Sequence, residues 1–213
     1  MARSIKSYTR IPVNERMFRI FLSRGTSVGG AIQRPERGTL DEEFKVSKRM
    51  FEKAAKDLKR KIGNLPPKKV RNAAFFYVET SGKYVADALK LSCEGIYVDN
   101  KSVQVPTQTL RHLHFQKNLL GNEEINIVVI DDIYDSGETA VKIAAAFSSY
   151  FRKKGILVRI TFAAALRRRQ EYERNSYGFS TFDFNTIPHC HLLYGKRAHS
   201  MKYFSMPWEW KTK

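Results

Sequence analysis

One segment constrains the fold more than any other: an apolar, largely β-branched run that ends in two adjacent aspartates. Residues 125–130 read Ile-Asn-Ile-Val-Val-Ile, and Asp131 and Asp132 follow directly. Such a run is typical of a fully buried strand in a parallel sheet. A short loop of small polar residues comes next, and an Ala-rich helix is predicted at 137–154. Because open α/β sheets bind ligands at the carboxyl ends of their strands, we expect a ligand site at this loop.

Strand and helix signals alternate along the chain around this segment. Helix patterns run from about Leu40 to Gly63, over 83–91 and over 137–154; strand patterns cover 73–78, 95–98, 125–130 and 156–166, and a charged helix or loop follows at 167–174. Strands that alternate with helices predict the α/β class, with an open, mostly parallel sheet and helices on both faces. The polar stretch 103–121 is predicted to form a long excursion or lid.

The chain shows no internal repeat and no Gly/Ser-rich linker, which predicts one compact domain at 39–213. The first 38 residues are interpreted as a basic N-terminal extension, because glycines and prolines interrupt any long helix there. A length of 213 residues is ample for a buried core.

Basic residues outnumber acidic ones by 38 to 21, which gives a formal net charge of +17. An excess of this size calls for an anionic partner, and aromatic residues such as Tyr8 and Phe18 lie among the N-terminal basic residues. We therefore expect association with RNA, DNA or a nucleoprotein. No apolar run approaches the roughly 20 residues of a membrane span, and no secretory leader is recognised. Two cysteines, Cys93 and Cys190, make no disulfide framework, so a cytoplasmic location is predicted.

The loop after the acidic pair has the chemistry of a phosphate and diol site. Ser136, Gly137 and Thr139 can offer backbone N–H groups and hydroxyls at the positive end of a helix, which suits a phosphate dianion. Asp131 and Asp132 can face sugar hydroxyls or the waters of a bound Mg²⁺, because hard cations prefer oxygen ligands.

This arrangement resembles the 5-phosphoribosyl-1-pyrophosphate loop of the type I phosphoribosyltransferases. Two further segments, 75–89 and 182–195, are similar to the pyrophosphate-binding and base-binding parts of the hypoxanthine-guanine branch, so that the resemblance covers about 68–208. The alternative is a plain strand-to-helix turn in which Asp135 or Ser136 caps the helix. That alternative explains the small residues but leaves the paired acids at the end of a buried strand unexplained.

The resemblance implies a role for each residue of these motifs. Asp131 and Asp132 match the acids that hold the ribose hydroxyls and Mg²⁺, and Asp135 matches the general base near the purine N7. Arg167, with Arg168 as the alternative, falls near the lysine that reads the exocyclic oxygen of a 6-oxopurine. The remaining matches are the 5′-phosphate cradle (Ser136, Gly137, Glu138 and Thr139), the pyrophosphate loop (Thr80, Ser81, Gly82 and Lys83) and the aromatic residue that stacks on the base (Phe182).

The reaction that the resemblance implies is displacement of pyrophosphate at the anomeric carbon by a nucleobase-like acceptor. The transition state is oxocarbenium-like, and Mg²⁺ neutralises the leaving group. Family members are commonly dimers or tetramers, so we also expect a homo-oligomer.

Several residues depart from the family pattern and favour a second hypothesis. Thr80 and Ser81 replace a Lys-Gly pair, Glu138 puts a negative charge in the phosphate loop, and His189 and Ser205 replace an acid and an arginine. The alternative is a phosphoribosyltransferase-like effector or nucleotide-sensing protein associated with nucleic acid, as in retron-type antiviral defence, with weak or no turnover. A zinc site at 189–191 is not expected, because alternation along a strand separates Cys190 from the flanking histidines.

Overall fold

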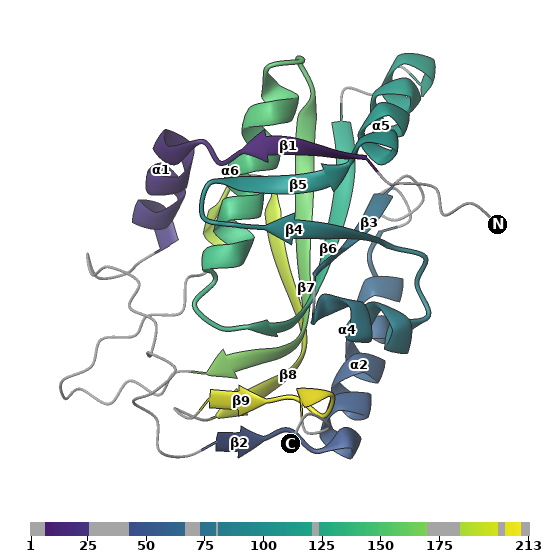
Figure 1. Ribbon diagram of the computed structural model, residues 1–213, viewed down its shortest axis with the longest axis vertical. Helices are drawn as coiled ribbons and strands as arrows, with labels where there is room; N and C mark the ends of the chain where they lie inside the picture. The colour runs from purple at the N-terminus through teal and green to yellow at the C-terminus, as the bar shows by residue number, and fades with distance from the viewer. Residues whose placement is uncertain are drawn as a thin grey trace.

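A computed structural model of the chain describes residues 7–25, 43–66, 73–79, 81–120, 124–169, 184–199 and 203–209 (Figure 1). Seven strands form one sheet in the order β1-β5-β4-β3-β6-β7-β8. The strands β3 (Ala73–Val78), β4 (Glu94–Val98), β6 (Glu124–Tyr134), β7 (Leu157–Arg169) and β8 (Cys190–His199) run parallel to one another. At the other end, β5 (Ser102–Pro106) and β1 (Tyr8–Pro12) are added antiparallel to their neighbours. The predicted α/β class with a mostly parallel sheet is confirmed.

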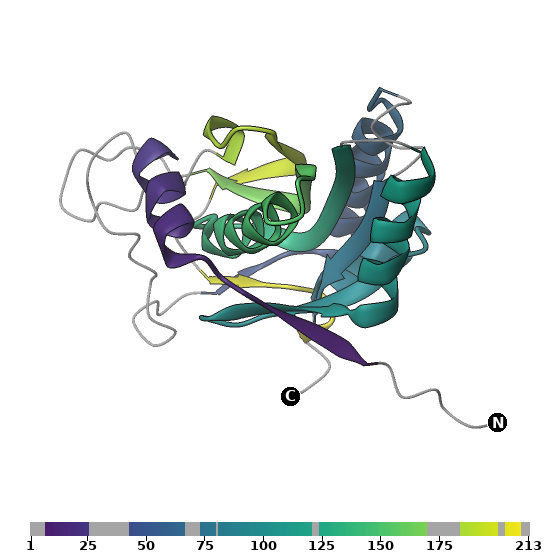
Figure 2. The same ribbon diagram turned by 90° about the horizontal axis from the view of Figure 1, so that it is seen from above.

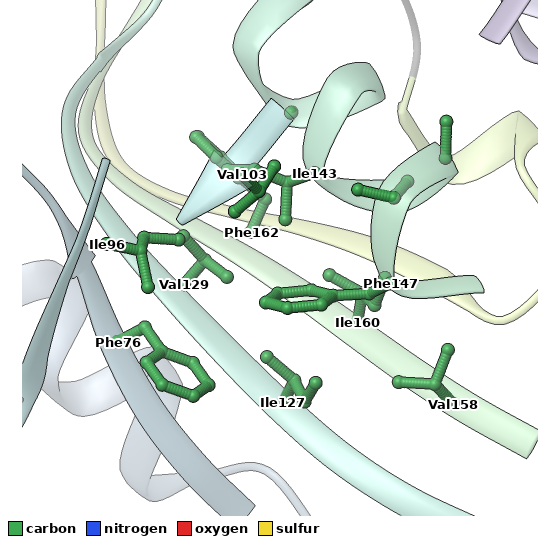
Figure 3. Packing of buried hydrophobic residues seen from close by; sticks show 14 of the residues in the cluster. Phe76, Ile96, Val103, Ile127, Val129, Ile143, Phe147, Val158, Ile160 and Phe162 are labelled. Atoms are coloured by element: carbon green, nitrogen blue, oxygen red, sulfur yellow. The ribbon is translucent and has the colours of Figure 1, made fainter. Parts of the chain in front are cut away.

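Helices cover both faces of the sheet, as predicted. The helices α1 (Glu15–Gly25), α5 (Thr107–Leu120) and α6 (Glu138–Arg152) share one buried cluster with Ile127 and Val129 of β6. Figure 3 shows the centre of that cluster, where Phe147 of α6 lies among apolar side chains of the sheet. The helices α2 (Lys48–Gly63) and α4 (Gly82–Leu89) pack against Val128 and Ile130 on the opposite face. This alternation along β6 follows from the two-residue period of a strand.

The remaining elements are short. A 3-10 turn, η1 (Phe184–Thr186), precedes β8, and a second, two-stranded sheet pairs β2 (Glu43–Lys45) with β9 (Tyr203–Ser205) (Figure 1). None of the helices in the described part of the chain is long and apolar enough to cross a bilayer.

The first long helix begins later than the sequence predicts. Residues 43–45 form β2, and α2 starts at Lys48 because Ser47 caps it: the Ser47 hydroxyl accepts a hydrogen bond from the Met50 N–H at 3.2 Å. The apolar residues that predicted a helix from about Leu40 therefore include Phe44, which belongs to strand β2, as well as the buried residues of α2. The predicted end at Gly63 is confirmed.

The stretch 103–121 is not a lid, so this prediction is wrong. It contains most of β5 and the whole of α5. Val103 and Val105 are fully buried at the two-residue spacing of a strand, and Leu110 and Leu113 are buried at helical spacing. Likewise the strand predicted to end at Leu166 continues as β7 to Arg169, and the rest of the expected charged helix or loop lies outside the described residues.

Part of the predicted N-terminal extension belongs to the main fold. β1 pairs with β5 through all five of its residues, and Ile11 is 1% exposed. Figure 2 shows α1 beside α6, and Phe21 of α1 is buried in the same cluster as α6. Residues 1–6 and 26–38 of that extension lie outside the described residues.

Candidate functional site

A polar cavity of about 370 Å³ opens where β3 and β6 end and the α4 and α6 helices begin. Its walls include Asp131 and Asp132 of the predicted site, and also Ser81 and Thr139. The cavity therefore brings together at least one residue from each of the three predicted motifs, which are those for ribose, phosphate and pyrophosphate. Residues that the sequence did not single out complete its lining: Val78, Glu79, Val98, Asp99, Asn100, Ile133 and Lys142.

Asp131 is the most deeply buried acid of the cavity, with 7% of its surface exposed. Its carboxylate accepts the Asp132 N–H at 2.9 Å, and the Ser81 hydroxyl hydrogen-bonds to both acids. Burial raises the pKa of Asp131 well above its ordinary value, and the neighbouring charge of Asp132 raises it further. Burial also raises the pKa of Asp132, whose carboxylate accepts the Ile133 N–H at 2.7 Å. A cation between the two carboxylates would offset the burial of their charges and their mutual repulsion, and so would lower both pKa values.

Gly82 brings the start of α4 against β6. A β-carbon at this position would lie 2.5 Å from the carbonyl oxygen of Ile130, so a larger residue does not fit. The close approach places Ser81 beside Asp131. Of the other residues predicted for the pyrophosphate loop, Lys83 is exposed and is absent from the cavity lining, and Thr80 lies outside the described residues.

The predicted phosphate loop directly precedes α6. Gly137 adopts a left-handed conformation with φ of 85°, which a side chain would oppose. The Ser136 hydroxyl accepts the Glu138 N–H at 3.3 Å, and Thr139 faces the cavity.

Glu138 does not place an uncompensated charge in the phosphate loop. Its carboxylate lies 2.6 Å from the Lys142 ammonium one turn along α6, and the two side chains are only 22% and 10% exposed, respectively. Lys142 also donates to the amide oxygen of Asn100 at 2.9 Å. Sequence reasoning missed Lys142, although a lysine among the alanines and apolar residues of α6, four positions after a glutamate, was a usable signal.

The turn between β4 and β5 forms one rim of the cavity through Asp99 and Asn100. The Asp99 carboxylate accepts the N–H groups of Lys101 and Ser102, both at 2.7 Å, and the Ser102 hydroxyl at 2.8 Å. The Lys101 N–H has the largest effect among these hydrogen bonds, which together lower the pKa of Asp99 to about 2. Asp99 is therefore charged at any physiological pH.

Several predicted residues do not line this cavity, among them Ser136, Gly137 and Glu138 of the predicted phosphate cradle. Asp135 follows β6 and is half-buried, but it is not among the lining residues. Arg167 lies near the end of β7, where its guanidinium carbon is 5.3 Å from the ring centre of Tyr194. Phe182 and the side chain of the alternative residue, Arg168, lie outside the described part of the structure.

The oxygen-rich donor set of the cavity fits Mg²⁺ rather than a soft metal. Asp131 and Asp132 are the residues that would hold it. Within the described ranges there is no cluster of three or more His, Cys, Asp or Glu side chains suited to a metal ion. This is compatible with Mg²⁺, which usually takes one or two carboxylates and completes its shell with waters and substrate phosphates.

Comparison with known proteins gives matches among solved structures alone, because no family model and no curated protein matches the chain. A purine phosphoribosyltransferase from Pyrococcus horikoshii Ot3 is 14% identical over 78% of this chain and 94% of its own, with a TM-score of 0.40. A xanthine-guanine-hypoxanthine phosphoribosyltransferase from Helicobacter pylori is 16% identical over 79% and 94%, with a TM-score of 0.44. A hypothetical protein from Neisseria gonorrhoeae with bound ppGpp is 14% identical over 79% and 89%, with a TM-score of 0.47.

The chain has an α/β fold with a mostly parallel sheet and with paired acids at the carboxyl end of a central parallel strand. Two of the three similar proteins are phosphoribosyltransferases, the family that the motifs of this chain resemble. At 14–16% identity and TM-scores of 0.40–0.47, this likeness assigns no role to any residue of the chain. The roles of individual residues in this chain therefore depend on the chemistry of its own cavity.

Proposed function

We propose that the chain is a Mg²⁺-dependent phosphoribosyltransferase, which transfers ribose 5-phosphate from phosphoribosyl pyrophosphate to a nucleobase-like acceptor. The observation that carries the proposal is the position of Asp131 and Asp132. They line a polar cavity at the end of β6, between the first turns of α4 and α6. Two carboxylates suit a ribose diol, and the first turns of two helices suit two phosphate groups.

Each side of the cavity has a separate task in this proposal. The N–H groups and hydroxyls of Ser136, Gly137, Glu138 and Thr139 bind the 5′-phosphate, and those of Ser81 and Gly82 bind pyrophosphate. Asp131 and Asp132 orient the ribose hydroxyls and hold the metal through its waters. When bound, Mg²⁺ supplies the positive charge that stabilises pyrophosphate as it leaves.

Asp135 is proposed to accept the proton that the acceptor base loses as its nitrogen bonds to the anomeric carbon. The carboxylate follows β6 directly, beside the phosphate loop, and would need to come within hydrogen-bond reach of that nitrogen. Arg167 and Phe182 keep their predicted roles as contacts of the acceptor base.

One observation favours a second candidate, a protein that binds a nucleotide in this cavity without turning it over. Lys142 is the one basic residue among the described residues that line the cavity, and its ammonium is already paired with Glu138. The leaving pyrophosphate would therefore lack a free lysine partner there. A sensor needs ribose and phosphate contacts but no stabilised leaving group.

Titration calorimetry with phosphoribosyl pyrophosphate and Mg²⁺ tests whether the cavity is the binding site. We expect saturable binding that is lost in Asp131→Asn/Asp132→Asn and kept in the matched control Asp57→Asn/Asp87→Asn, whose acids lie outside the cavity lining. Equal binding by the wild type and by Asp131→Asn/Asp132→Asn would exclude the proposed site.

A pyrophosphate-release assay with a panel of nucleobases then separates the two candidate functions. Release that requires both a base and Asp135 supports the transferase. Tight binding without release for every base supports the sensor.

A further inference from the structure

The outward face of α2 carries a stripe of positive charge. Phe51, Ala54, Ala55, Leu58 and Ile62 are its buried residues, and seven of the 16 residues of the helix are basic, against two acidic ones. Because successive residues are turned by about 100°, six of the basic residues fall within an arc of about 140°. These six exposed side chains, called the α2 ridge below, are Lys48, Arg49, Lys53, Lys56, Lys59 and Arg60.

The acidic residues of α2 leave most of the ridge charge unbalanced. Glu52 lies 4.0 Å from the Lys48 ammonium, at the limit of an ion pair, and both side chains are more than half exposed. Such an exposed ion pair contributes little free energy to the stability of the fold. Asp57 projects from the side of the helix, about 40° beyond the arc of the ridge. A surface with this excess attracts a polyanion, and the ridge extends for about 18 Å along the helix, enough for several nucleotides.

A second group of cations adjoins the end of α2, around Tyr194 of β8. The Lys61 ammonium and the guanidinium carbons of Arg167 and Arg197 lie 4.5, 5.3 and 5.4 Å from the centre of the Tyr194 ring. Lys61 also donates to the Tyr194 carbonyl at 2.6 Å. Burial alone would raise the pKa of Tyr194, but the hydrogen bond from Arg197 and the three cations lower it overall. The positive potential thus continues from α2 onto the outermost parallel strand.

An aromatic pair with one exposed ring, Tyr84, lies near the other end of α2. Tyr84 of α4 stacks on Trp208 with ring centres 4.5 Å apart and planes 9° from parallel, and Tyr84 is 47% exposed. Phe51 of α2 meets the same Trp208 ring edge-on at 5.2 Å. The pair is therefore held by the helix that carries the ridge. An exposed aromatic ring near a basic helix is a combination on which unpaired bases can stack.

From these observations we infer that the α2 ridge, with Tyr84 at one end and the Tyr194 cations at the other, binds single-stranded nucleic acid. The ridge contacts the phosphates and Tyr84 provides a stacking surface for a base. An acidic protein segment would match the charge but leave the exposed ring without a use. A duplex would match the charge but keep its bases paired. The α2 ridge is separate from the polar cavity, because no ridge residue lines it. Of the Tyr194 cations, Arg167 alone also has a part in the proposed transfer reaction.

Fluorescence anisotropy with a labelled RNA strand, a DNA strand of the same sequence and the corresponding duplex tests the inference at low and moderate salt. The ridge variant is Lys53→Gln/Lys56→Gln/Arg60→Gln. The control is Arg16→Gln/Lys101→Gln/Lys153→Gln, which removes three exposed charges elsewhere on the surface. All of these side chains are exposed, so both variants should fold, which a thermal melt verifies.

We expect the wild type to bind at least one of the two single strands. The ridge variant should lose about tenfold or more in affinity, and the slope of log affinity against log salt should fall by about 2, since each lost phosphate contact contributes about 0.7. The control should stay within about twofold of the wild type. Comparison of the RNA and DNA arms identifies the strand that is bound.

Two results would overturn the inference: no binding of either strand at low salt, or equal weakening in the ridge and control variants. A third variant, Tyr84→Leu, tests the stacking surface and should weaken single-strand binding without changing duplex binding. The assignment to single strands is wrong if Tyr84→Leu leaves both single-strand and duplex binding unchanged. It is also wrong if the duplex binds as tightly as the single strands. The ridge variant should still bind phosphoribosyl pyrophosphate, so this inference and the proposed function can fail independently.

Discussion

At the scale of single residues, the cavity holds two buried acids whose charged forms lower the stability of the fold. The carboxylates of Asp131 and Asp132 are buried next to each other, and the pKa of each is raised, chiefly by burial. The unfolded chain ionises these acids near pH 3.8, before the folded protein does. Stability from the two acids is therefore present at low pH and is lost as the pH rises through the raised values.

The variant Asp131→Asn/Asp132→Asn should accordingly be more stable than the wild type near neutral pH, while it loses the proposed ligand. An amide of similar shape removes the unfavourable burial of charge. Thermal denaturation at pH 5 and pH 8 measures the effect, with a larger difference expected at pH 8. A double variant that is less stable than the wild type at pH 8 would mean that the hydrogen bonds of the carboxylates outweigh their burial.

The ion pair of Glu138 and Lys142 predicts a stability effect of its own. Glu138→Gln leaves the Lys142 ammonium largely buried without its charged partner and should lower the free energy of unfolding by about 1–3 kcal/mol. Urea denaturation measures this loss. In Glu138→Gln/Lys142→Met the stranded charge is gone, so part of the stability should return. If the single and double variants lose the same free energy of unfolding, the ion pair of Glu138 and Lys142 makes no specific contribution to stability.

At the scale of elements, the packing of α4 on β6 depends on one glycine. Gly82→Ala would place a methyl group 2.5 Å from the Ile130 carbonyl oxygen, which is backbone and cannot turn aside. We expect a loss of about 1–3 kcal/mol, together with weaker ligand binding because Ser81 moves away from Asp131. Calorimetry and urea denaturation measure the two effects.

Gly63→Ala is the matched control for Gly82→Ala. Gly63 is the last residue of α2. Apart from its chain neighbours and the backbone of its own helix, no atom lies within 4 Å of the position that its β-carbon would take. This substitution should be neutral or stabilise the protein by up to about 1 kcal/mol, because alanine restricts the unfolded chain. Similar destabilisation by both substitutions would point to a general intolerance of alanine rather than to the contact with β6.

Elements with strong local signals could be predicted from the sequence, and those set by distant partners could not. The strand at 73–78 was predicted with its observed bounds, because its apolar run is short and ends at polar residues. β2 was missed because a three-residue strand is defined by its pairing with β9, at the far end of the chain. β5 was missed because polar Gln104 and Ser102 interrupt a pattern that becomes clear only beside β1 and β4.

The candidate site was predictable to a similar extent. The paired acids and the loop of small residues follow one strand, so local sequence indicated them. Asp99, Asn100 and Lys142 meet the acids only because the β4–β5 turn lies over the start of α6. Such a meeting depends on strand order, which no local motif contains.

At the scale of the whole molecule, the N-terminal segment closes one end of the sheet. β1 pairs along the whole of β5, and α1 packs on α6, so that Ile11 and Phe21 enter the main core. Deletion of residues 1–25 should expose β5 as a free strand edge and lower the melting temperature or cause aggregation. Deletion of residues 2–6 is the control and should change little. Melting curves and size-exclusion chromatography measure both; a soluble 26–213 protein with unchanged stability would contradict this account.

The turn between β4 and β5 has a kinetic consequence. Hydrogen bonds within the turn hold Asp99, and Lys142 holds Asn100, so we expect this rim to keep its conformation when a ligand binds. Entry past such a rim requires no opening step, and the observed rate in stopped-flow mixing should rise linearly with ligand concentration without reaching a plateau. The bound ligand would also stay in touch with water on that side. A transferase built this way would hydrolyse part of its donor whenever an acceptor is scarce.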